Sequence, residues 1–258
     1  MFGKRLTLFR LLGFAVRVDL SWIFIAGLVT WSLASAFHDE LPALSLVTCA
    51  GMGLAGMLGL FCSVVFHELS HSLVARKNGI AMHGITLFIF GGVAEMLNEP
   101  PSARAEFLMA IVGPLASFLL ALALKLLENA AVRAGLVPIV STLLDTLSLI
   151  NLGLACFNLI PGFPLDGGRV LRAVLWGVRK DLRWATRVAS GVGTFFGFAL
   201  MALGVLSFAG VLHRVGAGYV SGTWWFLIGM FLRAAARRTY RQLVVRDTVE
   251  SLSQQRGP

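Results

Sequence analysis

The chain has 258 residues, of which 57% are hydrophobic and only 14% are charged, and its mean hydropathy is +0.81. Ordinary globular domains carry roughly a quarter charged residues, so this composition excludes a soluble globular protein. The formal net charge of +9 comes from basic residues between apolar segments. That pattern indicates membrane topology and contact with anionic lipid headgroups, and no nucleic-acid binding is expected.

Apolar segments long enough to cross a bilayer as helices recur along the chain, since about 20 such residues suffice. They predict an all-α polytopic membrane protein with about six transmembrane helices, at approximately 20–37, 45–75, 105–127, 138–160, 187–209 and 221–236. Before the first of them, Leu6 to Arg10 and the alternating Val16 to Asp19 flank Gly13. This predicts a short hairpin at the membrane surface, with an amphipathic helix as the alternative.

Basic residues are distributed unevenly between the two sides of the predicted topology. Only Lys125, Arg133 and Arg214 fall on one side, and all the other Lys and Arg residues fall on the side of the termini. Cytoplasmic loops carry the excess of Lys and Arg, so both termini are expected in the cytoplasm. The small size and the lack of organelle-targeting features favour a prokaryotic cell membrane. We expect one membrane-embedded domain over 1–240 and a short polar tail over 241–258.

A shorter apolar segment, Ile80 to Leu97, follows the second predicted span. It is too short for two crossings, and it contains three glycines among β-branched and aromatic residues. Backbone that is not helical is tolerated at membrane depth only where protein covers it or water reaches it. The segment therefore predicts a small re-entrant β-hairpin, with strands over about 84–90 and 93–97 that turn at Gly91 and Gly92.

Two further patterns concern packing and surface residues. Gly51, Ala55 and Gly59 repeat every four residues, a spacing that is typical of closely packed membrane helices. Glu95, Glu99 and Glu106 lie near the predicted re-entrant segment, and they are expected to be solvated loop carboxylates, with gating of that segment as the alternative.

The second predicted span contains the segment His67-Glu68-Leu69-Ser70-His71. Residues four apart lie on one face of a helix, so the two imidazoles can bind one metal ion. In a chain of this composition the pattern would arise by chance in about 0.003 of cases. An acidic residue inside a span costs about 2.5–3.5 kcal/mol, which favours a functional role for Glu68. The alternative is a pair of core histidines satisfied by hydrogen bonds.

A catalytic zinc site has three protein ligands and one open position, so a third ligand is required. The leading candidate is Asp166, in the segment Asn158-Leu-Ile-Pro-Gly-Phe-Pro-Leu-Asp-Gly-Gly that ends the fourth predicted span. Its prolines and glycines let the chain leave helical geometry and present a carboxylate. The alternative role for Asp166 is to cap a helix that begins near Arg169.

Together these motifs resemble the site-2 protease family of intramembrane zinc metalloproteases, and the resemblance covers nearly the whole chain. The HExxH and NxxPxxPxDGG motifs are accompanied by Gly91-Gly92-Val93 and Gly113-Pro114. The resemblance implies a catalytic core over about 45–168 and one zinc ion per chain. It implies that zinc is bound by His67, His71 and Asp166, with Glu68 as the catalytic acid and base.

The resemblance also implies the substrates. Family members hydrolyse peptide bonds within or near the transmembrane segments of membrane-anchored proteins, often regulators of transcription. Some relatives carry PDZ or CBS domains, for which this sequence has no room. A regulatory membrane partner or a homo-oligomer is left open.

Two features give hypotheses about substrate binding. A substrate helix must unwind before its peptide bonds can be attacked, and an extended peptide can add to the edge of a sheet. The predicted hairpin is the candidate edge, where Gly91 and Gly92 allow close approach of the substrate backbone; a passive loop is the alternative. Asn158 is expected to bind the developing oxyanion or the substrate backbone, or else to cap the helix before Pro161.

Two functions of other classes compete with proteolysis. A metal-ion transporter would also place His and Asp within spans, but it usually needs polar residues along a path through the bilayer. The outer halves of the predicted spans are nearly free of them. A catalytically inactive membrane scaffold would tolerate the loss of Glu68.

Overall fold

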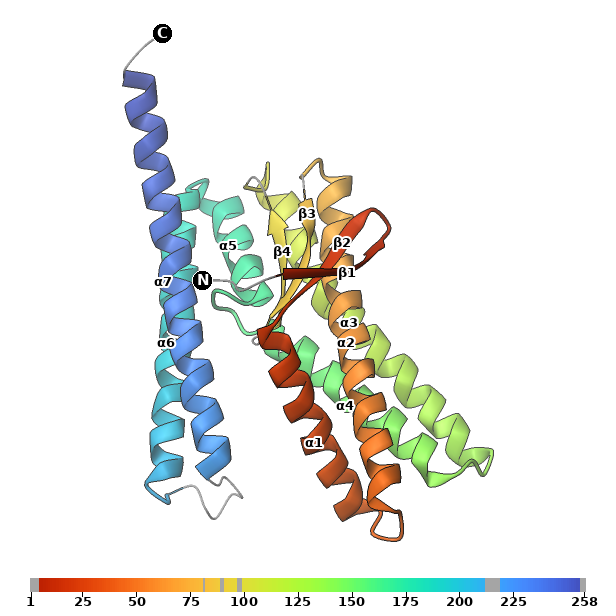
Figure 1. Cartoon of the computed structure of the whole chain (residues 1–258). Helices are drawn as coiled ribbons and strands as arrows, with labels where there is room; N and C mark the ends of the chain where they lie inside the picture. The colour runs from red at the N-terminus through yellow and green to blue at the C-terminus, as the bar shows by residue number, and fades with distance from the viewer. Residues whose placement is uncertain (1–4, 81, 89–90, 97–98, 212–218, 256–258) are drawn as a thin grey trace. The chain divides into compact units, whose positions relative to one another are not determined.

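The computed structural model describes residues 5–80, 82–88, 91–96, 99–211 and 219–255. The chain forms two compact units, which are described separately (Figure 1). Unit 1 comprises Met1–Pro101 and Val112–Phe157, and unit 2 comprises Ser102–Ile111 and Asn158–Pro258.

Long apolar helices dominate the described chain. Five of them are long and apolar enough to cross a membrane: α1 (Ser21–Glu40), α2 (Leu46–Lys77), α3 (Ala103–Arg133), α4 (Pro138–Asn158) and α6 (Leu182–Phe208). They match five of the predicted spans, which confirms the mainly helical, polytopic membrane fold. The sixth predicted span, 221–236, lies within α7 (Tyr219–Gln255). That helix is not among the five, and it carries arginines from Arg233 onward.

Glycines on α2 let neighbouring helices approach closely. A Cβ atom at Gly53 would lie 2.9 Å from the backbone nitrogen of Ala34 on α1, and one at Gly59 would lie 2.9 Å from Leu147 Cδ1 on α4. The predicted stripe at four-residue spacing is wrong in part, because Gly51 has no neighbour within 4 Å and Ala55 is exposed. The glycines in close contact with neighbouring helices are Gly53, Gly56 and Gly59, which are three residues apart.

A four-stranded sheet with the order β1-β2-β3-β4 belongs to unit 1. The strands β1 (Arg5–Leu11) and β2 (Phe14–Asp19) form the predicted N-terminal hairpin, and β3 (Met82–Phe88) and β4 (Gly91–Met96) form the second one. β2 and β3 pair in parallel, so the two hairpins make one sheet, which local patterns did not predict. The predicted turn at Gly91 and Gly92 is wrong, because both residues pair within β4. Residues 89–90 and 97 lie outside the described residues.

The sheet packs against the part of α2 that carries the two histidines. Side chains of β2 and β3 are buried together with Val65 and Leu69 of α2. Residues two positions apart on a helix point in nearly opposite directions. His67 and His71 are therefore directed away from the sheet. The sheet packs on one face of these helical turns, and the two histidines lie on the other face.

Unit 2 contains α5 (Asp166–Arg179) and the helix pair α6–α7. The two long helices meet at glycines. A Cβ atom at Gly197 would lie 2.8 Å from the carbonyl oxygen of Gly229, and one at Gly204 would lie 2.7 Å from that of Gly222. The order of these contacts makes the helices antiparallel. Backbone-to-backbone approach of this kind is a common way for membrane helices to associate.

Candidate metal centre

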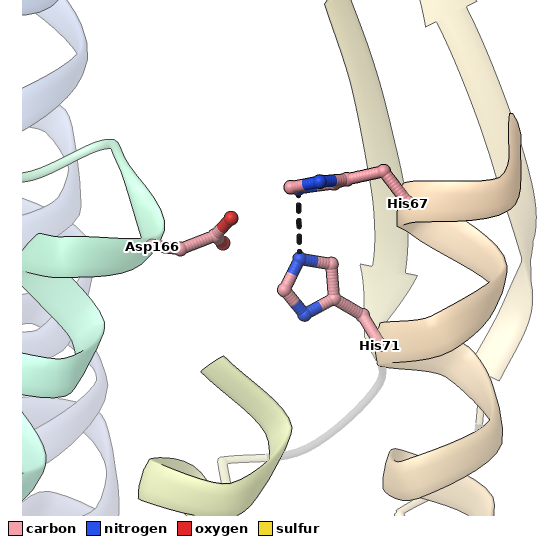
Figure 2. Close-up of side chains that lie close together, drawn as sticks. All are labelled: His67, His71 and Asp166. Carbon is pink, nitrogen blue, oxygen red and sulfur yellow. Dashed lines mark hydrogen bonds between the residues drawn. The ribbon is translucent and has the colours of Figure 1, made fainter. Parts of the chain in front are cut away.

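His67 and His71 lie one above the other on α2, as their spacing predicts. Both side chains are buried, and their Nε2 atoms are 3.1 Å apart. Figure 2 shows the two rings and the hydrogen bond between these atoms. Two imidazole nitrogens that converge in a buried position can share a proton or bind one metal ion.

A serine on α3 orients one of the two rings. The Ser117 hydroxyl lies 2.9 Å from Nδ1 of His67. When Nδ1 donates to this hydroxyl, the lone pair is on Nε2, the atom that faces His71. Metal-binding histidines almost always hold their second nitrogen in a hydrogen bond of this kind.

Gly113 of α3 keeps the space beside the two ring nitrogens open. A Cβ atom at this position would collide with Nε2 of His71 and would lie 2.8 Å from Nε2 of His67. Any residue other than glycine would therefore fill the position where both nitrogens point. The convergent nitrogens, the oriented ring and this cradle fit a transition-metal ion such as zinc.

The other predicted site residues have these positions. Glu68 follows His67 on α2 and is half-buried, and Asn158 is the last residue of α4. Gly91 and Gly92 begin β4, at one end of the sheet order. The structure therefore brings His67 and His71 together with Ser117 and Gly113.

Asp166, which Figure 2 also labels, is half-buried and is the first residue of α5. The cap residue of that helix is Leu165, which makes no side-chain cap hydrogen bond. Helix α5 thus begins three residues before the predicted start, and Asp166 is not its cap residue. The segment before it is fixed within unit 2, because the backbone N–H of Phe163 donates to the Ala189 carbonyl of α6 at 3.2 Å.

A buried ion pair in unit 2 was not predicted. Arg172 of α5 donates from Nε to Glu106 Oε1 of α3 at 2.6 Å, and its guanidinium carbon lies 5.2 Å from the centroid of the Phe163 ring. Glu106 is fully buried, so the prediction of a solvated loop carboxylate is wrong. Its burial is tolerated because the guanidinium compensates the charge. The pair ties α5 to α3 and to the segment that precedes Asp166.

A second missed residue, Asn151 of α4, is fully buried. Its side-chain nitrogen donates to Ser63 Oγ at 2.9 Å and to the Leu147 carbonyl at 2.8 Å. Ser63 lies one helical turn before His67, so this bond holds α4 against the part of α2 that carries the two histidines. The sequence feature that could have indicated Asn151 is its position as a lone asparagine within an apolar run. For Ser117 the feature is weaker: it lies one helical turn after Gly113.

A family model and two relatives match this chain. The model of the family described as Peptidase family M50 matches residues 55–134 and 124–204. The Synechocystis protein sll0528 is 38% identical over 243 residues, which cover 94% of this chain and 62% of that protein. Zinc metalloprotease MJ0392 of Methanocaldococcus jannaschii is 41% identical over 152 residues, which cover 57% of this chain and 42% of that protein. The chain thus spans less than two thirds of the length of these relatives.

A solved structure has the same fold. It is a site-2 protease from Methanocaldococcus jannaschii, with a TM-score of 0.60 and 28% sequence identity. The match covers 92% of this chain and 95% of the solved one.

Proposed function

Because the chain belongs to peptidase family M50, the site-2 protease family, we propose that it is an intramembrane zinc metalloprotease. It hydrolyses peptide bonds within or near the transmembrane segments of membrane-anchored proteins. The observation that carries this proposal is the buried pair of histidines that converges beside Gly113 on apolar helices. A zinc site that must exclude most of the surrounding lipid and still admit water would use such an arrangement.

One zinc ion is proposed to be bound by His67, His71 and Asp166. The first two offer Nε2 atoms from a single face of α2. Support for Asp166 comes from its position at the start of α5, where Leu165 and not Asp166 is the cap residue. A carboxylate with two histidines is a known ligand set of catalytic zinc.

The chemistry divides between the metal and Glu68. Zinc, when bound, acts as a Lewis acid that polarises a carbonyl group and makes water a nucleophile near neutral pH. Glu68, next to His67, accepts the proton of the attacking water and donates it to the amine that leaves. Ser117 holds the His67 ring in the orientation that presents Nε2.

This function is tested by zinc analysis and cleavage together. We expect the purified full chain to contain about one zinc ion and to cleave a tagged single-span membrane protein in detergent or liposomes. Asp166→Ala should lose zinc affinity by more than about 100-fold, beyond the usual effect of a residue that only supports a ligand. Asp39→Ala, which removes an exposed carboxylate of α1, is the matched control. A wild-type protein without zinc, or one with zinc that cleaves nothing, would refute the proposal.

The serine beside His67 gives a second prediction. Ser117→Ala should weaken zinc binding by about 10- to 100-fold, because the ring loses the partner that orients it. Competition with a zinc chelator measures the affinity, and the melting temperature reports on folding. Ser141→Ala, which removes an exposed hydroxyl from α4, should leave the affinity unchanged. Equal affinity of Ser117→Ala and wild type would show that the hydroxyl has no part in the site.

Substrate binding is proposed to involve β4 and Asn158. An extended substrate segment would add to β4, which lies at the end of the sheet order and has no further partner strand among the described residues. Gly91 and Gly92 let the substrate backbone come close to this edge. Asn158 is proposed to donate a hydrogen bond to the developing oxyanion, and an unchanged cleavage rate for Asn158→Ala would exclude this role.

Proline substitutions test the edge strand. Successive N–H groups of a strand point to opposite edges, so Val93 and Ala94, which pair with Thr86 and Ile85, direct one N–H to β3 and one outward. We expect one of Val93→Pro and Ala94→Pro to slow cleavage about tenfold without lowering the melting temperature, through the loss of one substrate hydrogen bond. Wild-type cleavage by both folded variants would contradict the edge-strand role.

The membrane setting is proposed from the charge distribution. Both termini lie in the cytoplasm because nearly all basic residues fall on that side, and the location is the cell membrane of a prokaryote. The membrane-embedded protease domain covers 1–240, with its catalytic core at about 45–168. The remaining residues, 241–258, form a short polar extension.

A further inference from the structure

A polar hollow lies between α6 and α7 within unit 2, and the proposed protease chemistry does not use it. Its volume is about 280 Å³, and we call it the arginine pocket. It is lined by Arg187, Ser190, Gly191 and Thr194 of α6 and by Arg237, Tyr240 and Arg241 of α7. This volume is close to the lower end of ligand-binding pockets, so it suits a small headgroup.

The lining carries three positive charges and no acidic side chain. Arg237 and Arg241 are four residues apart on one face of α7, where like charges destabilise a helix unless an anion compensates them. Arg187 is held in place, because its Nε donates to the Tyr240 hydroxyl at 3.0 Å. This hydrogen bond is the main reason why the pKa of Tyr240 lies below its ordinary value. Nearby positive charges favour the ionised phenolate in the same way.

The α6 side of the pocket is polar within an otherwise apolar span. Arg187, Ser190, Gly191 and Thr194 follow the spacing of a single helix face. Ser190 is 5% exposed, and its hydroxyl has no hydrogen-bond partner among the residues that the structure describes. The Thr194 hydroxyl, in contrast, donates to the Ser190 carbonyl at 2.8 Å. A buried hydroxyl beside three guanidinium groups can donate to an anionic oxygen in the pocket.

We propose that the arginine pocket binds a phosphate group. Guanidinium groups pair with phosphate oxygens through two parallel hydrogen bonds, and Ser190 supplies a further donor. An anionic phospholipid can deliver this group, because basic pockets between membrane helices accept such headgroups, and free phosphate carries the same chemistry. This proposal does not depend on the proposed protease function.

Native mass spectrometry of the full chain in a maltoside detergent tests the pocket. The protein is titrated with phosphatidylglycerol, with zwitterionic phosphatidylcholine, and with inorganic phosphate as a competitor. We expect phosphatidylglycerol to bind about tenfold more tightly than phosphatidylcholine, because the phosphate of phosphatidylcholine is joined to a cationic choline that the three arginines repel. The double variant Arg237→Gln/Arg241→Gln should lose this preference, since loss of a charge-assisted hydrogen bond corresponds to about tenfold or more. Arg238→Gln removes one arginine charge from α7 outside the pocket lining, and it should retain the preference.

Ser190→Ala provides a variant that removes only one buried hydroxyl, and it should weaken binding about tenfold while the protein remains folded. If inorganic phosphate displaces phosphatidylglycerol from wild type but not from the double variant, the pocket is a phosphate site that a soluble ligand can fill. Phosphatidylglycerol binding that resists phosphate would identify the lipid as the ligand. If wild type, Ser190→Ala and the double variant bind phosphatidylglycerol and phosphate equally, the proposal is wrong and the arginines serve topology alone.

Discussion

Replacing Glu68 by glutamine is expected to abolish peptide-bond hydrolysis while zinc binding stays intact. Glutamine has the size of glutamate but cannot accept a proton from water, and positioned acid–base groups contribute about 10²- to 10⁴-fold to the rate. The hydrogen bond between His67 and His71 joins their own Nε2 atoms, and glutamine would keep the size of Glu68, so the metal affinity should be unchanged. The measurement is zinc content by elemental analysis together with cleavage of a tagged single-span protein.

Glu40→Gln is the matched control, because Glu40 is an exposed carboxylate at the end of α1, and it should cleave like wild type. Cleavage by Glu68→Gln at the wild-type rate would remove Glu68 from the reaction. A metal-ion transporter would instead show metal flux and no cleavage product in either protein. An inactive scaffold would show neither, whichever residue stands at position 68.

Replacing Gly113 by alanine is expected to abolish zinc binding at stoichiometric concentrations, and with it all cleavage. The added methyl group would occupy the space at Nε2 of His71 and would come within 2.8 Å of Nε2 of His67. Relief requires one imidazole to rotate away, which removes a metal ligand. Alanine is also the better helix former, so the loss should not come from weaker helix formation.

Gly153→Ala controls for the change of residue type, because Gly153 lies on α4 with no neighbour within 4 Å. That variant should bind zinc like wild type and should be as stable or slightly more stable. Zinc content and melting temperature are measured for both variants. A folded Gly113→Ala protein with a full zinc complement would show that the metal does not lie beside this glycine.

The parts of the fold that could be predicted from the sequence are those with local causes. Long apolar runs predict helices wherever they occur, and the spacing of His67 and His71 on one helix fixes their convergence. The N-terminal hairpin was predicted from the alternation at Val16 to Asp19, which pair with β1 as expected.

Features that depend on distant residues could not be predicted in this way. Glu106 reads as a surface carboxylate until Arg172, 66 residues away, is placed beside it. The parallel pairing of Val16 with Ile85 likewise joins segments separated by two long helices. On α2, local spacing suggested Gly51 as a contact, whereas the position of α1 makes Gly53 the close one. The third zinc ligand, Asp166, stays a prediction.

The pairing of β2 with β3 has a consequence for biosynthesis. These strands lie on either side of α1 and α2 in the chain, so the ribosome must deliver both helices before the sheet can close. Until then, the segment of α2 around Val65 and Leu69 lacks β3, one of the two strands that cover it. The face of α2 opposite His67 and His71 therefore gains its full cover only after the first two helices have been synthesised.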